Sequence, residues 1–191
     1  YWVTGRPTHM ATNISPVKGV DIFLKAIKDI DISYNNVVFI IIGPVYKSQK
    51  KYYETIKKLI EPEFESKVIF VGGQKDVKPW LKLIDIYVCS SRFESSPTSV
   101  WEAMSMGKPV ISTDVGDVPL YIENNKNGFI VPSEDYHLLA DRIMHLLDNP
   151  KKILNFGAYS RKVAIKKLDL SICSQMHIDT YYLNFNHSYN K

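Results

Sequence analysis

The chain contains little cysteine and no hydrophobic run long enough to span a membrane. Only Cys89 and Cys173 occur among its 191 residues, and they lie far apart in sequence. We therefore expect no disulfide framework, and we expect the protein to reside in a reducing compartment. The longest apolar run, Val37–Ile42, has the length of a strand, whereas a membrane helix needs roughly 20 apolar residues. We expect a cytoplasmic protein, and the prediction extends to peripheral association with the cytoplasmic face of a membrane.

A strong charge excess is also missing. The net charge is +4, and the lysines are spread along the chain without a basic run that alternates with aromatic residues. This composition does not indicate a nucleic-acid surface. The five histidines show no metal-ligand spacing, and the Asp29-Ile30-Asp31 triplet closes a predicted helix. We therefore expect no metal site and no cofactor.

What the chain does contain is an alternation of strand and helix patterns, with 45% hydrophobic residues to form a core. Apolar runs closed by glycine, proline or serine predict strands, and apolar residues at helical spacing predict helices between them. Such βαβ units build a parallel sheet flanked by helices. The predicted fold class is α/β, a single Rossmann-like domain. The predicted strands cover 37–42, 68–71, 86–89, 109–113 and 129–131, and the predicted helices 21–30, 46–60, 76–84, 98–106, 118–123, 133–147, 152–167 and 171–183.

The two ends of the chain lie outside this pattern. Residues 1–9 (YWVTGRPTH) show no clean period, and His9-Met10 resembles a cloning junction, so we interpret them as a vector-derived leader. Residues 184–191 are polar and are predicted to fray. The domain is expected to cover residues 10–183.

The most informative stretch runs from Ser90 to Thr113, SSRFESSPTSVWEAMSMGKPVIST. Two carboxylates, Glu94 and Glu102, flank a small polar turn that follows a predicted strand and begins a predicted helix. Ligands of open α/β sheets bind at such strand ends, the first N–H groups of a helix attract anions, and carboxylates accept hydrogen bonds from hydroxyls. The stretch favours a ligand that carries both phosphate and sugar hydroxyls.

A purely structural interpretation remains open at this point. Ser99-x-x-Glu102 has the form of a capping box, which would account for Glu102 without a ligand. Glu94 would then be a solvated loop acid.

Several motifs occur in one order along the chain: Lys18-Gly19-x-Asp21, Ile42-Gly43-Pro44, Val68–Gly73, the loop from Glu94 to Glu102, Glu102-Ala103-Met104 followed by Gly107-x-Pro109-Val110, Gly116, and Asn127-Gly128-Phe129. From about Met10 to Leu183 this order resembles the C-terminal, donor-binding domain of retaining GT-B glycosyltransferases of the group 1, family-four type. The resemblance implies a nucleoside-diphosphate sugar as partner and a missing N-terminal domain that holds the acceptor. It also implies transfer of the glycosyl group without a metal, in polysaccharide biosynthesis or a related pathway, and little activity of this domain alone.

The resemblance also implies roles for individual residues. Glu94 would contact the hydroxyls of the transferred sugar, Lys18 beside Gly19 would neutralise the diphosphate, and Glu102 would bind the ribose. The backbone of Ser95, Ser96, Pro97 and Thr98 would contact the sugar, the amides of Ser99 and Val100 the diphosphate, and the segment with Gly73 and Val77 the base.

One position departs from the family pattern. Asn13 stands where the family has an arginine, and an amide cannot grip phosphate as a guanidinium does. Either Lys47 or Arg92 substitutes for it, or the enzyme is weak or inactive. Two other functions therefore stay open: a sugar-nucleotide epimerase of the same architecture, and a nucleotide-sugar binding module with weak catalysis.

Overall fold

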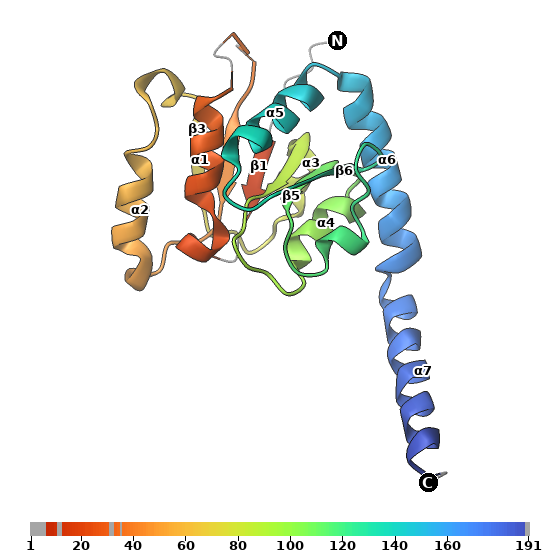
Figure 1. Ribbon diagram of the computed structural model, residues 1–191. Helices are drawn as coiled ribbons and strands as arrows, with labels where there is room; N and C mark the ends of the chain where they lie inside the picture. Colours follow the sequence, from red (N-terminus) through yellow and green to blue (C-terminus); the bar gives the residue numbers. More distant parts are fainter. Residues whose placement is uncertain (1–6, 11–12, 31–32, 35, 190–191) are drawn as a thin grey trace.

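The computed structural model describes residues 7–10, 13–30, 33–34 and 36–189, and of residues 7–10 and 183–189 it describes the backbone only. Its centre is one parallel six-stranded sheet in the order β3-β2-β1-β4-β5-β6 (Figure 1). The strands are β1 (Pro7–Met10), β2 (Phe39–Ile42), β3 (Val68–Gly72), β4 (Ile86–Cys89), β5 (Val110–Thr113) and β6 (Gly128–Val131). The predicted fold class is confirmed.

The strand β1 corrects, for Pro7 to His9, the prediction that residues 1–9 lie outside the domain; residues 1–6 lie outside the described residues. Its residues pair in parallel with β2 on one side, Thr8 opposite Ile40, and with β4 on the other, Thr8 opposite Tyr87. A central strand has backbone partners on both edges, so Pro7 to His9 belong to the fold. Pro7, which has no N–H, occupies the first position of the strand, where proline is tolerated.

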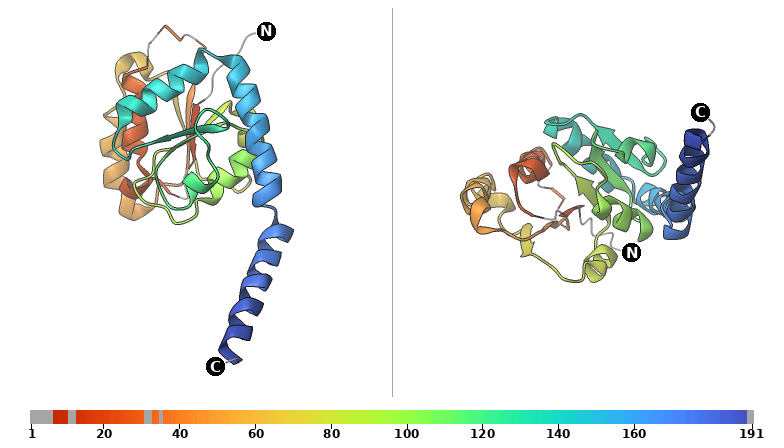
Figure 2. Two further views of the ribbon diagram at one scale, coloured as in Figure 1. Left: turned by 45° about the vertical axis from the view of Figure 1, so that its right-hand side comes forward. Right: turned by 90° about the horizontal axis from the view of Figure 1, so that it is seen from below.

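Helices cover both faces of the sheet, as buried parallel strands require (Figures 1 and 2). On one face α1 (Val20–Lys28) and α5 (Tyr136–Leu147) share a core with Phe39 and Ile41 of β2. On the other face α3 (Lys78–Leu83) and α4 (Thr98–Ser105) pack with Tyr87 and Cys89 of β4. The helix α2 (Lys50–Lys57) contributes Ile56 to the first core, and four 3-10 turns lie at 16–18, 47–49, 62–64 and 118–120.

The chain finishes with two long helices. The helix α6 (Pro150–Lys167) lies against the domain, and α7 (Leu170–Tyr189) extends away from it (Figure 2). The prediction that residues 184–191 fray is wrong up to Tyr189, because neither proline nor glycine follows Leu183 to end the helix; Asn190 and Lys191 lie outside the described residues. None of the helices described has the length and apolarity to cross a membrane.

Candidate functional site

The site lies where the strand order reverses. β1 and β4 are neighbours, but the chain after β1 continues toward β2 on one side and the chain after β4 toward β5 on the other. Their following loops, residues 13–19 and 90–97, lie at the carboxyl ends of these two strands, which is where open α/β sheets bind ligands. Both loops were predicted from sequence to carry site residues.

The structure joins Lys18 of the first loop to Glu94 of the second. The Lys18 Nζ atom lies 2.8 Å from Glu94 Oε1 and 2.9 Å from Oε2. The Ser91 hydroxyl donates to Glu94 Oε1 at 2.7 Å. The side chains of Lys18 and Glu94 are only 17% and 14% exposed, so the interpretation of Glu94 as a solvated loop acid is wrong.

Glycine at position 19 permits the two loops to approach. Gly19 has φ +63°, and a Cβ atom there would lie 1.8 Å from the carbonyl oxygen of Ser90. The Ser90 hydroxyl in turn donates to the Gly19 carbonyl at 2.7 Å. The Lys-Gly pair is thus a packing requirement of the site: the glycine supplies the close approach that places its neighbour Lys18 beside Glu94.

Gly116 supports the acidic loop from its other side. A Cβ atom on Gly116 would lie 2.1 Å from the Ser95 carbonyl oxygen, and that same carbonyl accepts a hydrogen bond from the Asp117 amide at 3.0 Å. Ser96 is tied separately, because its hydroxyl accepts a hydrogen bond from the Trp101 indole at 3.1 Å. The loop from Glu94 to Ser96 is therefore held in one conformation.

The start of α4 differs from two predictions. Its N-cap is the buried Pro97, with no side-chain capping bond, so the capping box of Ser99 and Glu102 does not form. Val100 is buried, and its amide donates to the Pro97 carbonyl at 2.9 Å. The prediction that the Val100 amide binds the diphosphate is therefore wrong, because this amide is already bonded to Pro97. The amides of Thr98 and Ser99 are the ones that remain at the helix start.

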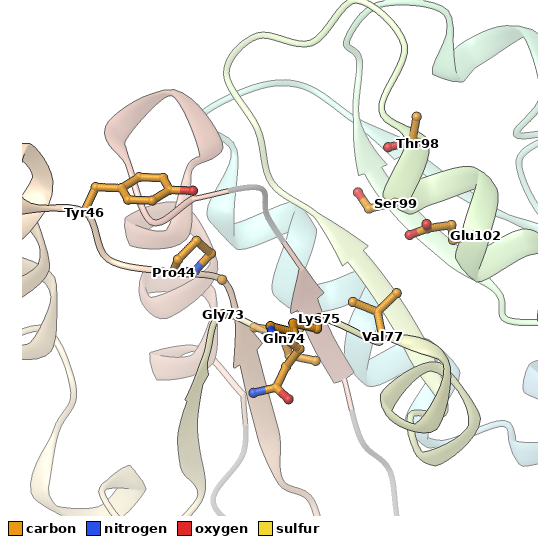
Figure 3. A pocket seen from close by; sticks show the side chains of 11 residues that line it. Pro44, Tyr46, Gly73, Gln74, Lys75, Val77, Thr98, Ser99 and Glu102 are labelled. Atoms are coloured by element: carbon orange, nitrogen blue, oxygen red, sulfur yellow. The ribbon is translucent and has the colours of Figure 1, made fainter.

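A pocket of about 510 Å³ lies beside this helix start. Figure 3 shows Thr98, Ser99 and Glu102 of α4 on one side of it and Pro44 and Tyr46 on the other. Five predicted residues line it: Gly73, Val77, Thr98, Ser99 and Glu102. The remaining predicted residues, Asn13, Lys18, Gly19, Glu94, Ser95, Ser96, Pro97 and Val100, are not among its lining residues.

Four lining residues were missed from sequence, namely Ile42 and Gly43 at the end of the predicted strand 37–42, and Pro44 and Tyr46 after it. Gln74 and Lys75 also line the pocket, and they fall within the segment 72–77 that was predicted to hold the base. Pro44 and Tyr46 lie on the loop after β2, and Gln74 and Lys75 lie on the loop after β3. The signal that could have found Pro44 and Tyr46 is their position: each follows a predicted strand that closes with glycine, so its loop ends at the same edge of the sheet as Lys18 and Glu94.

Glu102 is the acceptor that the pocket offers. Among the described residues its carboxylate has no hydrogen-bond or ion-pair partner, and protein atoms that displace water around it raise its pKa above the ordinary value of a glutamate. A carboxylate in this condition gains from two hydroxyl donors, which replace the lost water.

The buried Tyr87 of β4 contacts the start of α4. Its hydroxyl lies 2.7 Å from the Ser99 hydroxyl and anchors the start of α4 to β4. Burial raises the pKa of Tyr87 most, and the negative charges of Glu94 and Glu102 add to this effect. Neither the sequence spacing nor a motif indicated that Tyr87 contacts the start of α4.

The two residues suggested as replacements for the missing arginine do not fit that role equally. Arg92 is bound to Asp21 and Glu134, so its charge is already paired and the suggestion is wrong for Arg92. Lys47 begins a short 3-10 turn, and the lysine that lines the pocket is Lys75. Asn13 has a buried Oδ1 atom without a hydrogen-bond partner.

No cluster of three or more histidine, cysteine or acidic side chains that could hold a metal occurs among the residues described.

Comparison with known proteins identifies relatives over most of the chain. A family model described as glycosyl transferases group 1 matches residues 8–163. Spore coat protein SA of Bacillus subtilis is 32% identical over 158 residues, which is 79% of this chain and 42% of that protein. Poly(ribitol-phosphate) alpha-N-acetylglucosaminyltransferase of Staphylococcus aureus is 27% identical over 80% of this chain and 30% of its own length. The chain thus spans less than half of these relatives.

Solved structures share the fold. Anabaena HepE, crystallised in complex with UDP, superposes with a TM-score of 0.86 at 22% identity, over 94% of this chain and 49% of its own. The crystallised C-terminal domain of LpcC, a group 1 glycosyl transferase from Francisella tularensis, gives a TM-score of 0.80 at 21% identity, over 88% of this chain and 89% of its own. At these identities the likeness concerns the fold.

Proposed function

The chain belongs to the group 1 glycosyl transferases, and from that membership we propose that it binds a nucleoside-diphosphate sugar as the donor half of a retaining glycosyltransferase. The acceptor would be held by a domain outside this chain. Two structural matches support the proposal. This chain covers 89% of the crystallised C-terminal domain of LpcC, but it covers only 49% of the HepE chain.

One observation carries the proposal: an unpartnered carboxylate in a pocket and a lysine–glutamate pair lie on either side of one helix start. Glu102 faces the pocket formed with Gly73 and Val77, and Lys18 contacts Glu94. A nucleoside in the pocket would place its ribose at Glu102. Its diphosphate would meet the amides of Thr98 and Ser99, and the sugar would extend toward Glu94. Uridine is the base to test first, because HepE was crystallised with UDP.

The chemistry asked of these residues is stabilisation of a leaving group. Cleavage of the bond between the sugar and the diphosphate concentrates negative charge on the diphosphate. Lys18 and the helix-start amides would balance that charge, and such electrostatic stabilisation supplies much of the rate enhancement in many enzymes. Glu94 would hold the sugar hydroxyls and orient the reacting carbon. We expect no metal to take part, and we place the enzyme in the cytoplasm or at the cytoplasmic face of a membrane.

Incubation of the whole protein with a panel of nucleotide sugars separates the candidate functions. A transferase releases free nucleoside diphosphate, and an epimerase returns an isomerised donor without release. A binding module does neither but still binds UDP. Release of UDP in the presence of an acceptor supports the proposal, and isomerisation of the donor contradicts it.

A further inference from the structure

Arg92 lies two residues before Glu94 and binds two carboxylates at once. Its guanidinium donates to both oxygens of Asp21, on α1, at 2.8 and 2.7 Å. It also donates to Glu134 on the loop before α5, where Nη2 lies 3.1 Å from Oε2. The side chain is 30% exposed. Arg92 thereby connects the loop after β4 with two segments far from it in sequence.

The carboxylates that hold Arg92 are themselves oriented. The Tyr52 hydroxyl donates to Asp21 Oδ1 at 2.6 Å and accepts from the Asp21 amide at 3.2 Å, and Lys25 Nζ lies 4.0 Å from Asp21 Oδ2. Glu134 adopts φ +68°, a left-handed conformation that a residue with a Cβ atom takes only when its surroundings demand it. Burial alone would raise the pKa of Asp21, but the hydrogen bonds from Arg92 and Tyr52 outweigh it and hold that pKa below its ordinary value.

Arg92 also holds the turn that carries Lys18. Its amide donates to the Val17 carbonyl at 2.8 Å, and its Nη1 donates to the Pro16 carbonyl. Lys18 is the last residue of this turn, and Glu94 follows Arg92 after one residue. Both members of the Lys18–Glu94 pair are therefore attached to segments that Arg92 helps to hold, through its guanidinium and its backbone amide.

We propose that Arg92 is a positioning residue that sets the geometry of the Lys18–Glu94 pair and does not itself bind the donor. The inference rests on the proposed function of that pair. Its bonds to Asp21 and Glu134 neutralise its charge, so it offers little to a diphosphate. Its planar fork, which spans two carboxylates, is a geometry that lysine cannot reproduce.

The test compares Arg92→Lys with a matched control, Arg142→Lys, a change to a surface arginine of α5 that pairs with Asp141. For Arg92→Lys we expect UDP affinity of this chain within threefold of the parent. In the whole protein we expect kcat to fall at least tenfold, with KM for the donor within threefold. We expect the crystal structure of the variant to show Lys18 Nζ and Glu94 separated beyond hydrogen-bond distance. The control should change none of these quantities.

Two results would overturn the inference: an unchanged kcat, or an unchanged Lys18–Glu94 distance in the variant. A loss of UDP affinity above tenfold at that unchanged distance would make Arg92 a phosphate ligand. The double variant Asp21→Asn with Arg92→Gln removes both charges of the principal pair and guards against a variant that fails to fold. It should also show the kcat loss without a large loss of UDP affinity. If the parent chain binds none of the uridine, guanosine and adenosine diphosphates, the proposed function fails, whereas the Lys18–Glu94 distance in the variant crystal still decides the role of Arg92.

Discussion

The ammonium of Lys18 lies 2.8 and 2.9 Å from the two carboxylate oxygens of Glu94, although 76 positions separate the residues in sequence. Each partner is predicted to bind a different part of the donor, Lys18 the diphosphate and Glu94 the sugar. In the structure they bind each other. The donor therefore has to compete for Lys18, and removal of either partner should alter affinity for the other part of the ligand.

Glu94→Gln tests this competition. The amide keeps the shape of the side chain but releases Lys18, so UDP should bind more tightly, up to roughly fivefold for an ion pair worth up to about 1 kcal/mol. The added affinity of UDP-sugar over UDP should shrink, because the carboxylate acceptor of the sugar is lost. Calorimetric titration of both ligands measures the two effects. Weaker binding of UDP itself would show that Glu94 does not restrain Lys18.

Glu102 should make nucleotide binding depend on pH. Its pKa is raised by loss of surrounding water, so as the pH falls the carboxyl takes up a proton at a higher pH than an ordinary glutamate and then loses an acceptor for the ribose. UDP affinity should therefore be constant near neutral pH and decline on the acidic side. Glu102→Gln should bind UDP weakly at every pH, without that decline. A parent and variant with the same pH profile would exclude Glu102 from the site.

Asn13→Arg tests whether the missing arginine limits the site. The buried Asn13 Oδ1 has no partner, and a guanidinium at this position would add a charge-assisted contact worth about 1.5–3 kcal/mol. We expect UDP affinity to rise at least tenfold by calorimetry, and turnover of the whole protein to rise with it. Asn13→Gln, which adds length but no charge, is the control. Unchanged affinity and turnover in Asn13→Arg would mean that position 13 does not limit the site.

Gly19→Ala and Gly72→Ala form a matched pair. Both glycines have positive φ, +63° and +76°, but a Cβ atom on Gly19 meets the Ser90 carbonyl at 1.8 Å and one on Gly72 meets nothing within 4 Å. Gly72→Ala should cost only the left-handed backbone penalty, about 1–2 kcal/mol. Gly19→Ala should cost a further 1–3 kcal/mol or so, because the clash must displace backbone. Urea denaturation measures both. Equal costs would show that the two loops do not depend on this close approach.

Most of the fold could be predicted from sequence because its strands are continuous apolar runs. Two such runs, Val37–Ile42 and Ile86–Cys89, could be recognised as strands without knowledge of their partners. In the sheet they correspond to β2, which begins at Phe39, and to β4. Pro7–Met10 could not be recognised, because a proline, a threonine and a histidine give no strand pattern. This segment is a strand through its pairing with β2 and β4, which are distant in sequence.

The candidate site was predictable only in part for a related reason. Motif spacing indicated Lys18, Glu94 and Glu102, whose types match phosphate and hydroxyl chemistry. The sequence did not reveal that Lys18 and Glu94 pair, that Ser91 donates to Glu94, that Tyr87 contacts Ser99, or that Arg92 is held by Asp21. These contacts join residues whose proximity is created by the sheet order and by the tight packing at Gly19 and Gly116.

Calorimetric titration of UDP into the parent chain, Lys18→Met and Lys126→Met tests the central claim most directly. Lys126 pairs with Glu123 on the surface and serves as the control. We predict saturable one-to-one binding to the parent and the control, and binding weaker by about ten- to hundredfold in Lys18→Met, the loss of one charge-assisted contact. Equal UDP affinity in all three proteins, or no binding to the folded parent, would contradict a diphosphate site at Lys18.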